Sequence, residues 1–393
     1  MKTLLTVQTA PDSLRGRRRS AAGLFLIGLI ACLAIGVTVA SAQNYAVSDL
    51  GDLPNMKASA PAAINNSSQV VGISSAGADE HAFGYHKDYD KTMKEIGSCG
   101  SRAFAINASG LVAGDYAFVS PYGPERPSHA TLFKGRPVAD LGVLKGGLFS
   151  RANGINNWEQ VVGFSGPDRD AENSRAFVWT AATGMVDIGT LGGAYAQAYG
   201  INDAGFITGT AQTADGWIGA THAFLYQIVI GDGFSRPMID LGTLGGNSSH
   251  GLAINAQNHV VGYSTINTTD SRVHAFFYGD GRMVDLGSLS GKHVKADKSA
   301  ALAINSTDQV VGYSYLPSNE GPIQVGFIYN MSAAGARTGM QDLNGLIGSA
   351  AKQYRILAAT GINDLGEIVA TAVDGAGTVH AVLLTPSFGE VRQ

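Results

Sequence analysis

The chain has 393 residues, of which 45% are hydrophobic and only 15% are charged, and its formal net charge at neutral pH is -4. A chain of this length buries a large core, and its 52 glycines indicate many turns. Because the charge leaves no reservoir of Lys and Arg to neutralise phosphates, we expect no binding to nucleic acid.

The first 42 residues have the order of an export signal. A basic n-region, residues 1–20, precedes an apolar stretch, residues 21–40, and a small-residue cleavage site that ends at Ala42. Cleavage there would leave residues 43–393 as one mature repeat domain, which begins almost at once with a strand-like segment. We therefore expect a secreted or periplasmic protein, monomeric and without contact to a membrane.

Two alternatives to cleavage after Ala42 remain open. Leu29–Cys32 is similar to a bacterial lipobox, in which Cys32 would carry lipid and anchor a lipoprotein. The apolar stretch is also just long enough to serve as an uncleaved anchor. The residues after Cys32 stay apolar, which disfavours the lipobox. Because Cys99 is the only other cysteine, cleavage leaves no disulfide within the mature chain.

From residue 45 onward, four short segments recur in a fixed order, each of them seven times. Each segment is β-branched or aromatic and is bounded by turn residues, which predicts strands of about five residues. The first segment ends in Asp-Leu-Gly or a variant, at Asp49, Glu95, Asp140, Asp187, Asp240, Asp285 and Asp342. The second ends in Ile-Asn, at Ile64, Ile106, Ile155, Ile201, Ile254, Ile304 and Ile362. The third is Val-Val-Gly or a variant, beginning at Val70, Val112, Val161, Ile207, Val260, Val310 and Ile368. The fourth begins with His-Ala-Phe or a variant, at His81, His129, Arg175, His222, His274, Val325 and His380.

The second and third segments are joined so tightly that we expect a hairpin. Asn202–Gly205 is typical of a type I turn followed by a residue at positive φ. The last turn position holds Gly, Asn or Asp in five of the seven copies, whereas Ser68 and Glu159 depart from this rule. The fourth and first segments form a second predicted hairpin.

Four strands in each unit, with successive Asp-Leu-Gly segments 45 to 57 residues apart, predict an all-β fold. We expect a seven-bladed β-propeller whose blades are four-stranded antiparallel sheets. The segment Tyr45–Asp49 has no fourth segment before it, so we expect it to pair with His380–Leu384 and close the ring. In the competing arrangement, Phe388–Val391 supplies the missing strand instead.

The combination of His-Ala-Phe, Asp-Leu-Gly-Thr-Leu-Gly-Gly and Ile-Asn-x-x-Gly-x-Val-Val-Gly resembles the HAF family of bacterial extracellular repeats. The closest copy comprises His222–Tyr226, Asp240–Ser248 and Ala253–Asn255. The resemblance implies export and a propeller-like fold, but it implies no activity and no catalytic residues. Some copies are degraded, and in one of them Ser98–Gly100 replaces Leu-Gly-Gly.

The repeated His and Asp residues favour a structural role over a metal site. Residues one blade apart lie around a ring and are too far apart to share an ion. The repeated Asp is well suited to accept hydrogen bonds from backbone N–H groups of the glycine-rich loop that follows it. We therefore expect no metal and no cofactor.

We expect the chain to act as a non-catalytic binding module for a protein or carbohydrate ligand. The loops between third and fourth segments vary, and aromatic residues in and around them suit stacking on sugars or peptides. The candidate ligand-binding residues are Tyr116, Tyr122, Trp217 and Tyr315. They have an equally plain structural interpretation as anchors of their own loops.

Two other classes of function stay open. A propeller-fold glycoside hydrolase or lyase would use two acidic residues of the variable loops, and a structural cell-surface protein would bind no ligand. The acidic residues in those loops are Glu80, Asp115, Glu125, Asp168, Asp170, Glu172, Asp215 and Glu320. They are scattered and form no motif, so we assign no catalytic residue.

Overall fold

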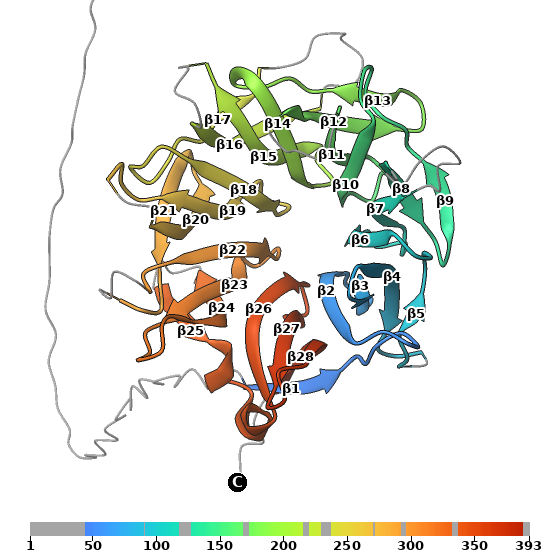
Figure 1. The fold of residues 1–393 in the computed structure, drawn as a ribbon. Helices are drawn as coiled ribbons and strands as arrows, with labels where there is room; N and C mark the ends of the chain where they lie inside the picture. The colour runs from blue at the N-terminus through green and yellow to red at the C-terminus, as the bar shows by residue number, and fades with distance from the viewer. Residues whose placement is uncertain are drawn as a thin grey trace, which may run out of the picture. The chain divides into compact units, whose positions relative to one another are not determined.

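The computed structural model describes residues 44–89, 91–117, 127–167, 173–214, 220–228, 237–269, 272–291, 296–331 and 337–387. In this part of the chain, 28 strands form seven four-stranded antiparallel sheets. Figure 1 shows the sheets as blades around a common axis, each with its first strand innermost. The predicted seven-bladed propeller is confirmed.

The blades follow one another in chain order. Blade 1 contains β2 (Ala58–Ile64), β3 (Gln69–Ala76), β4 (Asp79–His86) and β5 (Lys94–Glu95). Blade 2 contains β6 (Ser101–Ile106), β7 (Val112–Ala117), β8 (Ser128–Phe133) and β9 (Pro137–Asp140). Blade 3 contains β10 (Phe149–Ile155), β11 (Val161–Gly166), β12 (Arg175–Thr180) and β13 (Gly184–Asp187). Blade 4 contains β14 (Gly192–Ile201), β15 (Phe206–Thr213), β16 (Thr221–Gln227) and β17 (Ile239–Asp240). Blade 5 contains β18 (Ser249–Ile254), β19 (Val260–Thr265), β20 (Val273–Gly279) and β21 (Arg282–Gly287). Blade 6 contains β22 (Ser299–Ile304), β23 (Gln309–Leu316), β24 (Ile323–Met331) and β25 (Arg337–Asp342). Blade 7 contains β26 (Tyr354–Ile362), β27 (Ile368–Asp374), β28 (Val379–Ser387) and β1 (Asn44–Asp49).

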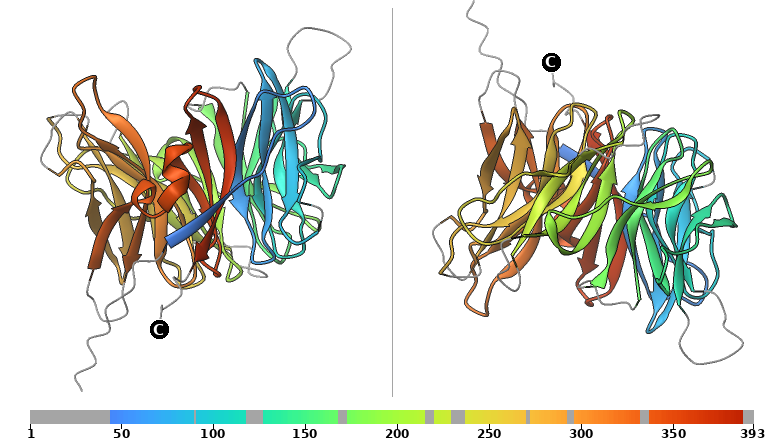
Figure 2. Two further views of the ribbon diagram at one scale, coloured as in Figure 1. Left: turned by 90° about the horizontal axis from the view of Figure 1, so that it is seen from below. Right: turned by 90° about the horizontal axis from the view of Figure 1, so that it is seen from above.

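The two ends of the described chain meet in blade 7. Strand β1 pairs antiparallel with β28, so that Asn44 lies opposite Ser387 and Asp49 opposite Val382. Figure 2 shows the blue N-terminal strand against the red C-terminal blade. The predicted closure by Tyr45–Asp49 is confirmed, and Tyr45 is buried there. Residues Phe388–Val391 of the competing arrangement lie outside the described residues.

The glycine of the third segment is required by close backbone approach. A Cβ atom added at Gly262 would lie 1.8 Å from the carbonyl oxygen of His250 and 3.1 Å from the ring of Phe276. The inner strand is bulged beside this point, between Gly251 and Ala253. Phe276 comes from the His-Ala-Phe segment and is fully buried. The repeated Gly therefore leaves the space into which the repeated Phe ring packs.

The hairpin turn between the second and third segments has the same backbone geometry in every blade. The last turn residue has a positive φ at all seven positions, which are Ser68, Gly110, Glu159, Gly205, Asn258, Asp308 and Gly366. Ser68, at φ 55°, and Glu159, at φ 58°, therefore depart from the predicted rule in residue type but not in conformation.

Helical structure is almost absent from the described residues. Two short 3₁₀ helices, η2 (Leu343–Gly345) and η3 (Gly348–Lys352), occupy the connection from blade 6 to blade 7. Among the described residues there is no helix with the length and hydrophobicity needed to cross a membrane.

Deletion of residues 43–52 tests the closure. We expect the unfolding midpoint to fall by about 5 °C or more, because the deletion removes a paired strand together with buried Tyr45 and Leu50. Differential scanning calorimetry measures the shift, and deletion of residues 388–393 serves as the comparison. A fall of only a degree or two after the first deletion would contradict closure by β1.

Replacement of Glu159 by Gly should stabilise the protein. Glu159 is exposed and adopts a left-handed conformation that costs an ordinary residue about 1 kcal/mol. We expect Glu159→Gly to raise the free energy of unfolding by about 0.5–1 kcal/mol in urea titrations. Gly205→Ala, at the equivalent turn position, should lower the free energy of unfolding. A decrease for Glu159→Gly together with an increase for Gly205→Ala would refute the idea that the two turns impose the same backbone strain.

Candidate functional site

A ring of buried asparagines joins the blades at one end of the axis. The side-chain amide of each Ile-Asn asparagine donates to the backbone carbonyl oxygen of the corresponding asparagine in the next blade, over 2.8 to 3.2 Å. The seven residues are Asn65, Asn107, Asn156, Asn202, Asn255, Asn305 and Asn363. The bond from Asn363 to Asn65 completes the circle between the last blade and the first.

These asparagines line a cavity of about 530 Å³ on the axis, but their hydrogen-bonding groups are already used. Each side-chain oxygen accepts from two backbone N–H groups of its own turn; Asn202, for example, accepts from Ala204 and Phe206. In six of the seven, the second amide N–H is also donated, as from Asn202 to Asn258. The ring therefore closes the propeller and offers little to a ligand.

The repeated His residues pair with the acidic residue of their own blade. The Nδ1 atoms of His129, His222 and His274 lie 2.8 to 3.1 Å from the carboxylates of the Asp-Leu-Gly segments. The same Asp residues accept a hydrogen bond from the glycine two positions later; Asp240, for example, accepts from Gly242. These pairs tie the third strand of a blade to its fourth.

The innermost strands carry a second group of residues that breaks the repeat. The residue four positions before the Ile of Ile-Asn is Arg102 in blade 2, Arg151 in blade 3, Gln197 in blade 4 and His250 in blade 5, but it is alanine in blades 6, 7 and 1. Phe104 and Tyr199 occupy the position two before the Ile in blades 2 and 4, where blades 6 and 7 have Leu302 and Thr360. Polar and aromatic side chains are therefore concentrated on one arc of the ring.

A buried carboxylate organises the arginines of this arc. Asp115 on β7 is fully buried and accepts from Nε and Nη2 of Arg102 at 2.8 and 2.6 Å, and from Nε of Arg151 in the next blade at 3.1 Å. The side chains of Arg102 and Arg151 remain 22% and 28% exposed. Because one carboxylate holds both guanidinium groups, their positions are set before any ligand arrives.

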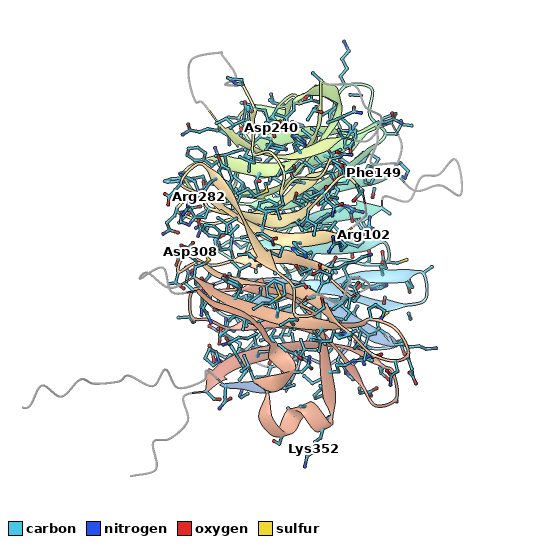
Figure 3. The ribbon with its side chains drawn as sticks, turned by 90° about the vertical axis from the view of Figure 1, so that its left-hand side faces the viewer. Arg102, Phe149, Asp240, Arg282, Asp308 and Lys352 are labelled. Carbon is cyan, nitrogen blue, oxygen red and sulfur yellow. The ribbon has the colours of Figure 1, made fainter. Side chains whose placement is uncertain are left out.

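Aromatic rings pack against the same guanidinium groups. The guanidinium carbon of Arg151 lies 5.0 Å from the centre of the Phe104 ring and 5.5 Å from that of Phe164. Phe149, also on β10, contacts the same group from 6.0 Å. Figure 3 labels Arg102 and Phe149, which belong to neighbouring blades. We call Arg102, Phe104, Asp115, Arg151 and Phe164 the inner-strand cluster.

The arc continues into blades 4 and 5 with neutral hydrogen-bonding groups. His250 stacks on Tyr263 with ring centres 4.5 Å apart, and its Nδ1 lies 3.0 Å from the hydroxyl of Thr210. Burial lowers the pKa of His250 to about 4 and raises that of Tyr199 to about 12. Both side chains are therefore uncharged at neutral pH. The arc combines fixed cations, neutral donors and aromatic faces.

The ligand-binding residues predicted from the sequence lie elsewhere. Of the acidic candidates, Asp115 belongs to the inner-strand cluster, but it is buried on β7 and does not lie in a variable loop as expected. Tyr116 donates to or accepts from Ser98 at 2.8 Å and packs between blades 1 and 2. Tyr315 donates to Gln324 at 3.1 Å. Both are half-buried; Tyr116 makes a contact between two blades and Tyr315 makes one within its own blade. Tyr122 and Trp217 lie outside the described residues, as do most of the acidic candidates. The other members of the inner-strand cluster were missed, although comparison of the seven copies position by position would have revealed the two arginines and Phe104.

The depressed pKa of His250 predicts a pH dependence of stability. The unfolded chain takes up a proton at His250 near pH 6.5, whereas the folded protein takes it up only near pH 4, so stability falls as the pH is lowered between these values. In urea unfolding at pH 7 and pH 4.5, we expect His250→Gln to lose about 2 kcal/mol less than the wild type. An equal loss in the wild type and His250→Gln would disprove the assignment.

Comparison with known proteins finds a partial match to a family whose function is unknown. It also finds distant similarity to solved structures. Residues 193–380 match a family described as a protein of unknown function, DUF3466. No curated protein matches the chain. The GH32 beta-fructofuranosidase BmSUC1 of Bombyx mori is 9% identical over 88% of this chain and 91% of that chain, with a TM-score of 0.34. Its mutant in complex with sucrose gives the same identity and coverage, with a TM-score of 0.33. A mutant of AofleA from Arthrobotrys oligospora is 11% identical over 88% of this chain and 90% of that chain, with a TM-score of 0.30. Similarity this low assigns no activity.

Proposed function

We propose that this protein is an exported, non-catalytic binding module that holds a carbohydrate chain against the inner-strand cluster. The observation that carries this proposal is the break in the repeat. Residues that maintain the blades recur around the ring, whereas Arg102, Phe104 and Arg151 occur on one arc and are partly exposed. A feature that the fold does not need in the other blades is a candidate for binding.

The chemistry of the cluster suits sugars. Saccharides present apolar C–H faces that pack on aromatic rings, and hydroxyl groups that pair with fixed planar donors. Phe104 offers a ring, and the guanidinium groups of Arg102 and Arg151 offer donors held in place by Asp115. The two guanidinium charges are offset by Asp115 and by Glu80, whose carboxylate lies 3.9 Å from Arg102. This near-neutral balance favours a neutral saccharide over a strongly anionic one.

The environment of Asp115 supports binding over hydrolysis. A glycosidase needs two carboxyl groups that reach the scissile bond. Asp115 has no exposed surface, and both of its oxygens accept hydrogen bonds from guanidinium groups. It therefore acts as a positioning residue for the arginines.

A glycan array probed with the exported chain tests this proposal. We expect Phe104→Ala and Arg151→Gln each to weaken binding to the recognised glycan about tenfold or more, because they remove a stacking face and a fixed donor. Leu302→Ala provides a matched control, since Leu302 occupies the position of Phe104 in blade 6. It should leave the affinity unchanged.

The other outcomes separate the competing functions. Loss of binding in Tyr122→Ala or Trp217→Ala, with Phe104→Ala unaffected, would place the site in the variable loops. Selective binding to a peptide array would indicate a protein ligand, and cleavage of a bound glycan would indicate an enzyme. Absence of binding to both arrays would favour a structural cell-surface role.

A further inference from the structure

One connection between blades places a thiol beside a histidine and a carboxylate. Ser98-Cys99-Gly100 replaces the usual Leu-Gly-Gly at the junction of blades 1 and 2. As a result, one ligand atom each from Asp79, His81 and Cys99 lie within 4.8 Å of one another. Sulfur, imidazole nitrogen and carboxylate oxygen are the three kinds of ligand that Zn²⁺ takes in proteins.

The backbone holds these three residues in place. Asp79 and His81 belong to β4, and Asp79 pairs with Ala76 across a tight hairpin. The loop that carries Cys99 is attached to the same strand, because the N–H of Gly100 donates to the carbonyl oxygen of Glu80 at 2.8 Å. The positive φ of Gly100, 85°, completes the turn. The ligand atoms are therefore brought together by backbone contacts.

A second carboxylate orients the histidine. The Nδ1 atom of His81 lies 2.8 Å from Glu95, and its Nε2 atom lies 3.2 Å from Asp79. A histidine that binds zinc commonly donates its other ring N–H to a carboxylate, which fixes the ring and increases its basicity. Glu95 is placed to serve in this way, leaving Nε2 for the metal.

We propose that Asp79, His81 and Cys99 form a Zn²⁺ site at the junction of blades 1 and 2. The ligands are the Asp79 carboxylate, Nε2 of His81 and the Cys99 thiolate, with water in the fourth position. Tetrahedral zinc ligands lie about 3.3–3.8 Å apart, so closure needs shifts of about 1 Å. Binding releases the thiol proton to solvent. This proposal differs from the expectation of no metal stated in the sequence analysis.

The other histidines of the same segment show why blade 1 differs. His274 lies between Asp285 and Asp297, and His380 between Asp49 and Asp374, so a histidine between two carboxylates recurs in the fold. Asp297 is also paired with Arg272 at 3.0 Å. Among the described residues, the thiol is found only at the site in blade 1, where no guanidinium pairs with Asp79.

Cobalt and zinc titrations of the full, metal-free chain test the site. We expect one equivalent of Co²⁺ to produce thiolate-to-cobalt charge-transfer absorption, and Zn²⁺ to displace the cobalt. Cys99→Ser should abolish the absorption, and His81→Gln should weaken Zn²⁺ binding about tenfold or more. Cys32→Ser and His222→Gln are the matched controls and should behave as the wild type.

A measurement on the unmodified chain guards against variants that fail to fold. Zn²⁺ should slow alkylation of Cys99 by iodoacetamide, with the modified residue identified by mass spectrometry. Absence of stoichiometric binding, equal binding by Cys99→Ser, or alkylation at the same rate with and without Zn²⁺ would each overturn the proposal. Glycan binding is not part of this readout, so the two proposals stand or fall separately.

Discussion

The hydrogen-bonded asparagine ring is the interaction on which the rest of this structure depends. Each asparagine performs two tasks at once, since its oxygen holds the turn of its own hairpin and its amide nitrogen holds the next blade. The groups are buried, so an unpaired member would carry the full cost of desolvation, about 1–3 kcal/mol. The position of each turn therefore sets the position of its neighbour, and the geometry repeats until the circle closes.

Closure between blades 7 and 1 needs contacts that a simple repeat does not supply. Glu367 of blade 7 accepts from Ser68 at 2.5 Å and from Lys87 at 2.6 Å, both in blade 1. Burial alone would raise the pKa of Glu367, but Lys87, Ser68 and Asn363 hold it below its usual value. The bond to Glu367 accounts for the serine at position 68, because Ser68 tolerates the strained turn and its hydroxyl gains a partner in the neighbouring blade. Strand β1 reinforces the same seam by completing blade 7.

Residues that take no part in the repeated contacts of the ring can differ from one blade to the next. The glycine, phenylalanine and asparagine positions are constrained by close packing and by saturated hydrogen bonds, so variation there is costly. The positions two and four before the Ile of Ile-Asn on the innermost strands differ between blades, and so does the loop that carries Cys99. There the chain places the inner-strand cluster on one arc and the Asp79, His81 and Cys99 group at one junction. Both proposals arise where some blades depart from the repeat.

The sequence by itself determined the number of blades, the four strands of each and the geometry of the hairpin turns. These depend on local periodicity and turn chemistry, which every copy displays, so even the pairing of the terminal strands could be predicted. The tertiary structure alone decided which groups meet. Asn363 reaches Asn65 across 298 residues, and Arg151 of blade 3 shares Asp115 with Arg102 of blade 2. No local pattern encodes such contacts, because they depend on how neighbouring blades face one another once the ring has closed.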